Sequence, residues 1–449
     1  MLYRKIERYI KDWLKENRNK ILIVDGARQI GKSYIIRKCG RELFKNYIEI
    51  NFVEDKQGER LFEKVNSTDD FYFTLSTIHG DKMQDKENTV IFLDEIQEYP
   101  QFITLLKFLK QEDKYTYIAS GSLLGVTLAD TSSIPIGSIE IKRMYQLDFE
   151  EFLIANGFSK EAINTLEEKF NSRQSLDEAM HNKMLDLFKK YLIVGGLPDC
   201  VNEFLSSRNV MKIRQIQNDI TRFYGEDATK YDRERKLKIK RIYDMLPSTM
   251  QSVNKRIIVK DIEGVNGKRF SNYTDEFDYL ISSGIALDVK AISNPVFPLC
   301  QSEDKNLLKL YMNDVGVLSN ILFKTNTKPI LEDIRSINLG ALYETAVAVQ
   351  LKALGHKLFY YDNRKNGEVD FLIDDYSNLS VLPVEVKSGR DYQIHSALNH
   401  FISNDSYPVS CGMVLSNERE IKVKDKVTYI PIYFVIFLKQ KNDESSFLI

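Results

Sequence analysis

The sequence predicts an α/β protein whose N-terminal third contains a parallel sheet. Strand-length apolar runs alternate with helical patterns over this third, as in crossover units that join parallel strands. A glycine-rich turn follows the first apolar run, and two acidic residues end a later one. We expect strands at residues 21–24, 47–52, 90–93, 115–119 and 139–141, preceded by an amphipathic helix within residues 1–20.

The chain of 449 residues is too long for a single hydrophobic core, so several domains are expected. Pattern changes and breaks place a first α/β domain at residues 1–155 and a helical lid at 156–225. Short helices and a strand that fit a winged helix-turn-helix follow at 226–292. A loop rich in Pro, Asn and Ser then leads to a second α/β module at 293–449.

Composition excludes several classes of protein. A formal net charge of −1 gives no overall attraction to nucleic acid, and four scattered cysteines form neither a disulfide framework nor a zinc site. The longest apolar runs, such as residues 430–438, are only strand-length, so no membrane span is predicted. The charged N-terminus lacks the features of a secretory signal, and we expect a cytoplasmic protein.

The glycine-rich turn follows the pattern GxxxxGK[ST], with a strand before it and a helix starting near Lys32. This arrangement directs backbone N–H groups and a helix N-terminus at phosphates. Lys32 is expected to reach the β- and γ-phosphates, and Ser33 to ligate Mg²⁺. The alternative is an ordinary glycine-rich turn. The predicted ATP-binding residues are Gly26, Ala27, Arg28, Gln29, Ile30, Gly31, Lys32, Ser33 and Tyr34.

A second motif supports this site. The run at residues 90–93 ends in Asp94 and Glu95, which is the Walker B form. Asp94 is predicted to hold Mg²⁺ and Glu95 to polarise the attacking water, because phosphoryl transfer needs neutralised charge and an oriented nucleophile. The alternative is that the acids cap the following helix. Ser120 and Ser122 end the next predicted strand, where they could contact the γ-phosphate or the water.

These motifs, together with LDFEEFL and YLIVGGLPDCV, make the whole chain resemble prokaryotic AAA+-like ATPases with a C-terminal domain of unknown function. The resemblance implies that Pro198, in a GxP-type turn, packs on the adenine. A helix-breaking turn is the equal alternative. No arginine lies between Arg60 and Arg143, where many oligomeric AAA+ enzymes place an arginine finger, so the sequence does not predict fast hydrolysis in a ring. Arg28 or Arg143 could act on the phosphates or form a structural ion pair.

The C-terminal module contains an acid on one predicted strand, Asp370, and a Glu385–Lys387 pair on the next. This pattern resembles the PD-(D/E)xK nuclease core, and the module is predicted to be restriction-endonuclease-like. Period-two alternation puts Glu385 and Lys387 on one face of their strand. Asp370 and Glu385 could share Mg²⁺ while Lys387 orients water, and Glu344 could complete the site. The alternatives are a surface ion network or a degenerate, non-cleaving domain.

A run of basic residues leads into the winged-helix-like region and makes DNA a candidate partner. A solvated helix face is the alternative. The run comprises Lys230, Arg233, Arg235, Lys236, Lys238, Lys240 and Arg241.

Two functions fit the whole sequence. The first is a Mg²⁺-dependent ATPase whose ATP state repositions a nuclease-like half that acts on DNA. The second is a switch or scaffold that turns over ATP slowly and carries an inert nuclease-like fold. Nothing in the sequence indicates an oligomer.

Overall fold

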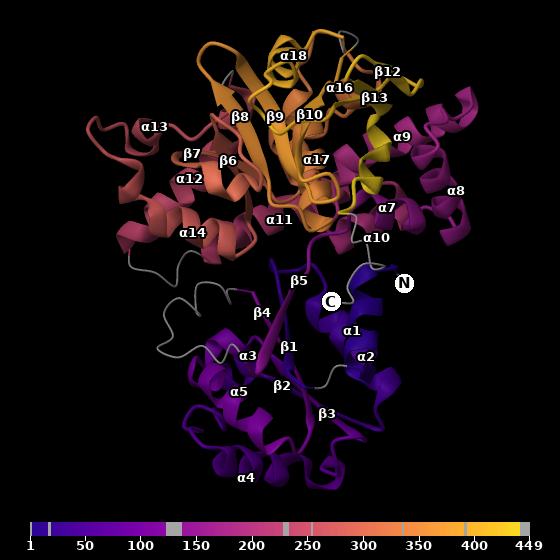
Figure 1. Cartoon of the computed structure of the whole chain (residues 1–449). Coiled ribbons are helices and arrows are strands. Elements are labelled where there is room, and N and C mark those ends of the chain that lie inside the picture. Colours follow the sequence, from indigo (N-terminus) through magenta and orange to yellow (C-terminus); the bar gives the residue numbers. More distant parts are fainter. Residues whose placement is uncertain are drawn as a thin grey trace. The chain divides into compact units, whose positions relative to one another are not determined.

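The computed structural model describes residues 2–16, 19–122, 137–227, 233–252, 255–334, 336–389 and 393–440. They form two compact units. The first unit comprises Met1–Tyr145 with Asp278–Ile285, and the second comprises Gln146–Phe277 with Ala286–Ile449. Figure 1 labels the elements of both units. No helix among the described residues has the length and apolar character needed to cross a bilayer.

The sheet of the first unit has the order β2-β3-β4-β1-β5, and every neighbouring pair is parallel. This confirms the predicted parallel sheet. Because all strands run the same way, their carboxyl ends meet at one edge. The strands are β1 (Ile21–Asp25), β2 (Asn46–Asn51), β3 (Thr89–Asp94), β4 (Thr116–Gly121) and β5 (Ile139–Arg143).

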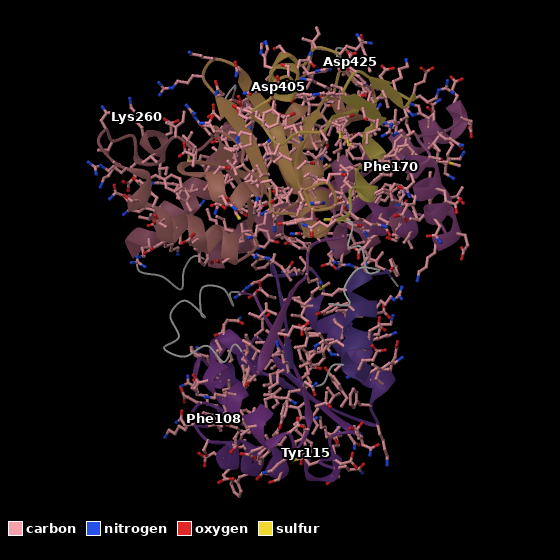
Figure 2. All side chains as sticks on the ribbon, viewed as in Figure 1. Phe108, Tyr115, Phe170, Lys260, Asp405 and Asp425 are labelled. Atoms are coloured by element: carbon pink, nitrogen blue, oxygen red, sulfur yellow. The ribbon has the colours of Figure 1, made fainter. Side chains whose placement is uncertain are left out.

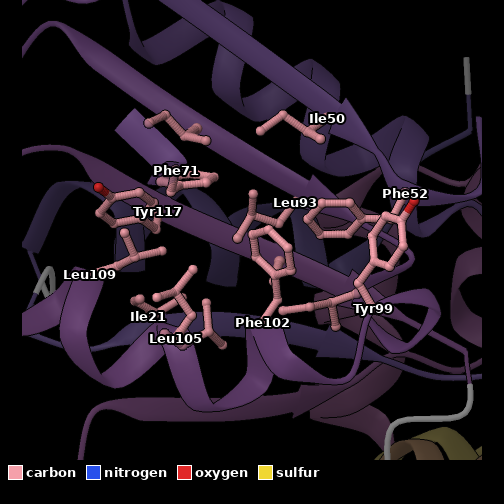
Figure 3. Close-up of a cluster of buried hydrophobic side chains, with 14 of the residues drawn as sticks. Ile21, Ile50, Phe52, Phe71, Leu93, Tyr99, Phe102, Leu105, Leu109 and Tyr117 are labelled. Atoms are coloured by element: carbon pink, nitrogen blue, oxygen red, sulfur yellow. The ribbon is translucent and has the colours of Figure 1, made fainter. Parts of the chain in front are cut away.

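Helices cover this sheet, and aromatic residues from them lie in a buried core cluster with aliphatic residues of the strands. Phe52, Phe71 and Phe102 are fully buried there, and the ring centroids of Phe52 and Phe102 lie 4.5 Å apart (Figure 3). The helical elements are α1 (Lys5–Glu16), α2 (Lys32–Leu43), α3 (Phe52–Gln57), α4 (Thr68–His79), η1 (Gly80–Lys82), η2 (Ile96–Glu98) and α5 (Gln101–Glu112).

The second unit contains a mixed sheet of order β12-β13-β11-β10-β9-β8-β6-β7. The helix α18 packs on β9, and α17 packs on β10, β6 and β7. The strands are β6 (Ala286–Ile292), β7 (Glu303–Met312), β8 (Phe359–Asn363), β9 (Gly367–Asp375), β10 (Ser380–Val386), β11 (Gly412–Ser416), β12 (Lys422–Lys424) and β13 (Val427–Pro431).

The helices of the second unit include the expected helical stretch after residue 156, which α7 precedes. They are α7 (Phe149–Ala155), α8 (Lys160–Asn171), α9 (Glu178–Val194), α10 (Pro198–Ser207), α11 (Val210–Asp227), α12 (Arg233–Gln251), α13 (Val259–Glu263), η4 (Phe270–Asn272), α14 (Thr274–Ser282), η5 (Leu299–Ser302), α15 (Val315–Phe323), α16 (Lys328–Leu331), α17 (Gly340–Ala353), α18 (Ser396–Ile402) and η6 (Ile432–Phe437). Of these, α14 continues from the second unit into the segment Asp278–Ile285.

Two features differ from the sequence-based expectations. The predicted boundary near residue 293 falls between β6 and β7, which pair antiparallel within one sheet, while β6 also pairs with β8. Backbone hydrogen bonds therefore join residues 226–292 to the C-terminal module. The apolar run 430–438 is not one strand, because β13 ends at Pro431 and η6 follows. Every residue of η6 is buried, so hydrophobicity alone could not separate strand from helix there.

Substitution of Phe102 tests the aromatic cluster. Phe102→Ala should lower the unfolding free energy of the first unit by about 3–5 kcal/mol, because it removes a fully buried ring and leaves a cavity. Trp13 is the only tryptophan of the chain and lies in this unit, so its fluorescence during urea unfolding reports the transition.

The matched control is Phe108→Ala on the same helix. The side chain of Phe108 is 46% exposed, and Figure 2 shows this residue at the edge of the first unit. This control should shift the unfolding free energy by less than about 1 kcal/mol. Equal effects of the two substitutions would contradict the assigned core.

Candidate functional site

Two glycines shape the turn between β1 and α2. Gly26 has φ 145°, and a Cβ at this position would lie 2.3 Å from the carbonyl oxygen of Met144. Gly31 caps α2 with φ 91°, in the left-handed region. A side chain is disfavoured at both positions, at Gly26 by close approach and at Gly31 by backbone conformation. The glycine pattern in the sequence therefore has a direct geometric cause.

Lys32 is the first residue of α2, and it folds back over the turn. Its side chain is buried, and Nζ donates to the carbonyl oxygens of Gly26 (2.9 Å) and Ala27 (2.7 Å). Burial lowers the pKa of the Lys32 ammonium, and the nearby carboxylates of Glu95, Asp25 and Asp94 oppose that effect. A buried cation of this kind is stabilised by an anion, as a phosphate would be.

Ser33 and Asp94 lie in contact although they are 61 residues apart. Ser33 Oγ donates to Asp94 Oδ1 at 3.0 Å, and Ser120 Oγ, at the end of β4, donates to the same oxygen. Burial raises the pKa of Asp94, while the two hydroxyl donors lower it. The structure thus brings together the two predicted Mg²⁺ ligands.

Glu95 adopts a left-handed backbone conformation with φ 55° and ψ 50°. This region is strained for a non-glycine residue, and such strain is often found at functional sites. The Glu95 carboxylate accepts hydrogen bonds from Ser122 Oγ (3.2 Å) and from Gln97 Nε2. These contacts fix its orientation. Sequence analysis did not single out Gln97, although it lies only two residues after Glu95.

The remaining predicted residues of the loop occupy different environments. Gln29 has φ 60°, Ile30 is fully buried, Arg28 is partly buried, and Tyr34 is 52% exposed. Arg143 Nε lies 3.9 Å from Asp25 Oδ2, and its Nη2 donates to the carbonyl oxygen of Ile281. These contacts favour the structural role that the sequence left open for Arg143.

The turn at Gly195–Pro198 belongs to the second unit, where Pro198 is the first residue of α10. Asp314 holds this turn, since Asp314 Oδ2 accepts from the Gly196 backbone N–H at 2.7 Å. Burial raises the pKa of Asp314 to about 6, although backbone N–H donors lower it. No sequence motif marked Asp314. The contact of Pro198 with adenine stays a prediction.

The predicted acids of the C-terminal module come together in the second unit. β9 and β10 are antiparallel with Phe371 opposite Val384, and continuing this register puts Asp370 opposite Glu385. Asp370 Oδ2 accepts from the Val386 backbone N–H (2.8 Å), and Lys387 Nζ donates to Glu385 Oε1 (2.7 Å). Burial, followed by the charge of Asp370, raises the pKa of Glu385 to about 8, against the opposing effect of Lys387.

Further charged residues extend this cluster. Glu344 on α17 forms an ion pair with Lys255 and accepts a hydrogen bond from Tyr311 Oη (3.0 Å). Burial by itself would lower the pKa of Lys255, but Glu344 and Asp370 more than offset this and raise it. Lys309, whose side chain is fully buried, pairs with Glu368. Sequence analysis missed Lys255, Lys309 and Tyr311, which lie in no recognised motif, and it did not single out Glu368, which lies two residues before Asp370 on β9.

Metal binding at Asp370 and Glu385 stays a prediction. Among the described residues, no group of three or more His, Cys, Asp or Glu side chains is arranged to hold a metal ion. Both acids already have partners, as described above. The position of Glu344 near Asp370 agrees with its predicted membership of the cluster.

The basic run on α12 is engaged with neighbouring acids. Arg235 lies 3.3 Å from Asp275, Lys240 lies 2.7 Å from Asp244, and Arg241 lies 3.8 Å from Glu263. Lys230 and the side chain of Arg233 fall outside the described residues. These exposed ion pairs are what a solvated helix face would show, and DNA contact stays a prediction.

A model of a known protein family matches the first part of the chain. Residues 18–153 match a family model described as an AAA domain. Residues 185–328 and 339–435 match two models described as domains of unknown function, DUF8612 and DUF4143. No curated protein matches the chain. The first match supports an AAA-type P-loop domain that binds nucleotide, and the others assign no function to the rest.

Several solved structures align with the chain at low sequence identity and low TM-score. A Walker-type ATPase of Pyrococcus abyssi is 13% identical, with a TM-score of 0.43 over 71% of this chain and 95% of that chain. The ORC1 protein of Aeropyrum pernix, in complex with DNA, is 13% identical, with a TM-score of 0.32 over 74% and 94%. The Holliday junction branch migration motor RuvB of Thermotoga maritima is 14% identical, with a TM-score of 0.29 over 64% and 89%.

Substitution of Gly196 tests the Asp314-held turn. A Cβ at Gly196 would lie 2.0 Å from the carbonyl oxygen of Leu147. Gly196→Ala should therefore destabilise the second unit by roughly 1–3 kcal/mol, measured by thermal unfolding with circular dichroism. The control Gly225→Ala lies inside α11 with nothing within 4 Å of its added Cβ, and should instead stabilise by about 0.5–1 kcal/mol. Similar melting curves for the two variants would contradict the assigned packing.

The raised pKa of Glu385 predicts a pH dependence of stability. The folded pKa of about 8 exceeds the ordinary glutamate value of about 4.3, so the folded state holds this proton more tightly than the unfolded state. The resulting contribution to stability is fully present below about pH 4 and is lost as the pH rises towards 8. Wild type should therefore lose stability relative to Glu385→Gln between pH 5 and pH 8 in urea unfolding. Parallel pH profiles would show that the Glu385 carboxyl titrates normally.

Proposed function

We propose that the first unit is a Mg²⁺-dependent ATP hydrolase. The observation that carries this proposal is the hydrogen bond between Ser33 Oγ and Asp94 Oδ1, which puts a hydroxyl and a carboxylate side by side next to Lys32. Mg²⁺ in nucleotide sites is held by one or two such oxygen ligands together with phosphate oxygens and water. The residues present therefore fit the ion.

Each residue has a distinct role in this proposal. Lys32 exchanges its bonds to the Gly26 and Ala27 carbonyl oxygens for phosphate oxygens. Ser33 and Asp94 hold the cation, which when bound neutralises charge on the phosphates. Glu95, oriented by Ser122 and Gln97, accepts a hydrogen bond from the attacking water and aligns it for attack. No covalent intermediate is required.

We expect slow turnover by the isolated chain. The sequence has no arginine between Arg60 and Arg143, and Arg143 contacts Asp25 and a backbone carbonyl. Stabilisation by an arginine contributes a factor of about 10³–10⁵ to turnover in related phosphoryl transfers. This supports a partner-stimulated ATPase or, as the alternative, a slow switch.

The ATP state is proposed to be coupled to the second unit. The chain passes between the units after Tyr145, after Phe277 and after Ile285, so one stretch of α14 and the following turn belongs to the first unit. Arg143, at the end of β5, bonds to that stretch. The polypeptide chain that leaves β5 and the stretch bonded to Arg143 both continue into the second unit, and we propose that a change at the nucleotide site is passed on through them.

Lys32→Ala and Glu95→Gln should each lower the rate of Mg²⁺-dependent phosphate release by about 10²-fold or more, because they remove charge stabilisation and water orientation. Lys107→Ala, on the exposed surface of α5, should leave the rate unchanged. If DNA stimulates ATP hydrolysis by the wild type, the coupled ATPase is favoured. If hydrolysis is slow and DNA does not change its rate, the switch is favoured. Undiminished phosphate release by Lys32→Ala would refute the site.

A second candidate function is metal-dependent cleavage of DNA by the second unit. It is favoured by the position of Asp370 opposite Glu385 on adjacent strands, with Lys387 bonded to Glu385. The cation would be held by Asp370 and Glu385, and Lys387 would orient the attacking water. The basic run on α12 would contribute phosphate contacts.

Plasmid DNA incubated with Mn²⁺ or Mg²⁺ tests this second candidate. Wild type should nick the plasmid, and Asp370→Ala and Lys387→Ala should each reduce nicking by about 10²-fold or more. Lys290→Ala, which removes a partly exposed ion pair with Glu303 on the same sheet, is the control and should nick as wild type does. Equal nicking by wild type, Asp370→Ala and Lys387→Ala would contradict this function and would favour a nuclease-like fold that does not cleave DNA.

A further inference from the structure

Arg4 is a buried arginine beside the glycine-rich turn of the first unit. It lies one residue before α1, and its backbone carbonyl oxygen accepts from the Glu7 N–H at the start of that helix (3.1 Å). Arg4 is only 6% exposed. Its Nη1 donates to the carbonyl oxygen of Ile30 (2.8 Å), and its Nη2 donates to that of Tyr145 (2.5 Å). One guanidinium group therefore joins two backbone carbonyls that lie far apart in the sequence.

The first of these carbonyls belongs to the peptide that joins Ile30 to Gly31. In a planar trans peptide the C=O and the N–H point in opposite directions. The bond from Arg4 to the Ile30 oxygen therefore turns the Gly31 N–H to the side away from Arg4. Gly31 is the N-cap of α2, and the N–H groups at the start of a helix are those that bind phosphate. Arg4 thus sets the direction of an N–H group at the predicted phosphate site.

The second carbonyl belongs to a segment that itself contacts the turn. Tyr145 follows Met144, whose N–H donates to the carbonyl oxygen of Asp25 at the end of β1 (2.7 Å). The carbonyl oxygen of Met144 lies so close to the turn that a Cβ at Gly26 would be 2.3 Å from it. The bond to Tyr145 therefore fixes the Arg4 guanidinium relative to the start of the turn while its other bond holds the end.

Ion pairs hold α1, and with it Arg4, against α2. Glu7 pairs with Lys38 of α2 (2.6 Å), and Lys11 pairs with Glu42 of α2 (2.5 Å). The two helices lie side by side (Figure 1). The Arg4 side chain is thus presented from a docked helix, which limits the positions that its guanidinium can take.

We propose that Arg4 is a positioning residue for nucleotide binding, which holds the Ile30–Gly31 peptide in the orientation that binds phosphate. The proposal rests on the proposed ATP site, because it concerns the same turn. A turn that is already oriented loses less conformational freedom when a phosphate binds, so its affinity is higher. A guanidinium suits this role, because its planar fork bonds two separate oxygens in a fixed geometry.

Calorimetric titration of the full chain with ADP and Mg²⁺ tests this role, because it measures binding and not turnover. Arg4→Met keeps most of the stem but removes both donors. It should weaken ADP binding by about tenfold or more, since the Gly31 N–H would no longer be directed at the phosphate in a charge-assisted hydrogen bond. In hydrolysis assays KM should rise while kcat changes by less than about threefold, as expected for loss of uniform binding. Unchanged ADP affinity in Arg4→Met would overturn the proposal.

Two controls separate this role from a general loosening of α1. Lys11→Met removes the ion pairs with Glu7 and Glu42 but leaves both bonds of Arg4 in place. Arg8→Met removes a side chain of the same helix that is 86% exposed. Both controls should bind ADP with wild-type affinity. If Lys11→Met lost as much affinity as Arg4→Met, the effect would come from the docking of α1 and the positioning role would be wrong.

Arg4→Lys separates the charge from the geometry. It keeps the positive charge but lacks the planar fork, and it should weaken ADP binding by about threefold or more. Wild-type affinity in this variant would show that charge alone suffices, which contradicts the proposal. If Arg4→Met does not fold, the same titration of Arg4→Lys decides the question.

The same measurements distinguish this proposal from the proposed hydrolase. If wild type binds ADP but releases no phosphate from ATP, the hydrolase is refuted and the affinities of the Arg4 variants still decide the positioning role. If wild type binds no nucleotide, both proposals are wrong.

Discussion

Parallel pairing of the strands in the first sheet is the constraint on which the nucleotide site depends. β4 lies between β1 and β3, so the carboxyl ends of all three strands meet at one edge. Asp94 ends β3, and Ser120 near the end of β4 bonds to it. Ser33, just after the loop that follows β1, reaches the same carboxylate. No single helix or loop could bring these side chains together.

Both units contain buried lysine side chains, but the partners of these lysines differ between the units. In the first unit the buried Lys32 ammonium donates to loop carbonyl oxygens and lies near several acids, and a phosphate would be a stronger partner for it. In the second unit the lysines are already bonded to carboxylates. Breaking such buried pairs is costly, which makes this cluster resistant to change unless another cation replaces the one removed.

Local backbone strain coincides with these charged groups. Glu95 and Lys255 both adopt left-handed conformations that are rare for residues with long side chains. In each case surrounding contacts hold the conformation, through Ser122 and Gln97 for Glu95 and through Ser252 for Lys255. Strain of this kind persists only where the neighbouring structure fixes it, so both residues are held in defined orientations.

The sequence by itself determined the features that depend on neighbours along the chain. The five strands of the first sheet, the turn at Gly26–Ser33 and the acids Asp94 and Glu95 at the end of β3 followed from periodicity and motif, because a phosphate-binding motif requires those residues at that spacing. The Asp370, Glu385 and Lys387 set was also visible, since alternation along adjacent strands fixes which side chains share a face.

Only the tertiary structure decided the partners that come from distant segments. Lys255 and Tyr311 reach Glu344, Asp314 holds the turn at Gly196, and β6 and β7 join the sheet of the C-terminal module. These contacts span tens to more than a hundred residues and carry no local pattern, because long-range pairing is set by packing and charge balance and not by propensity. The apolar run at residues 430–438 is divided at Pro431 between the end of β13 and the short helix η6, and burial on all sides erases the periodicity that would tell a strand from a helix there.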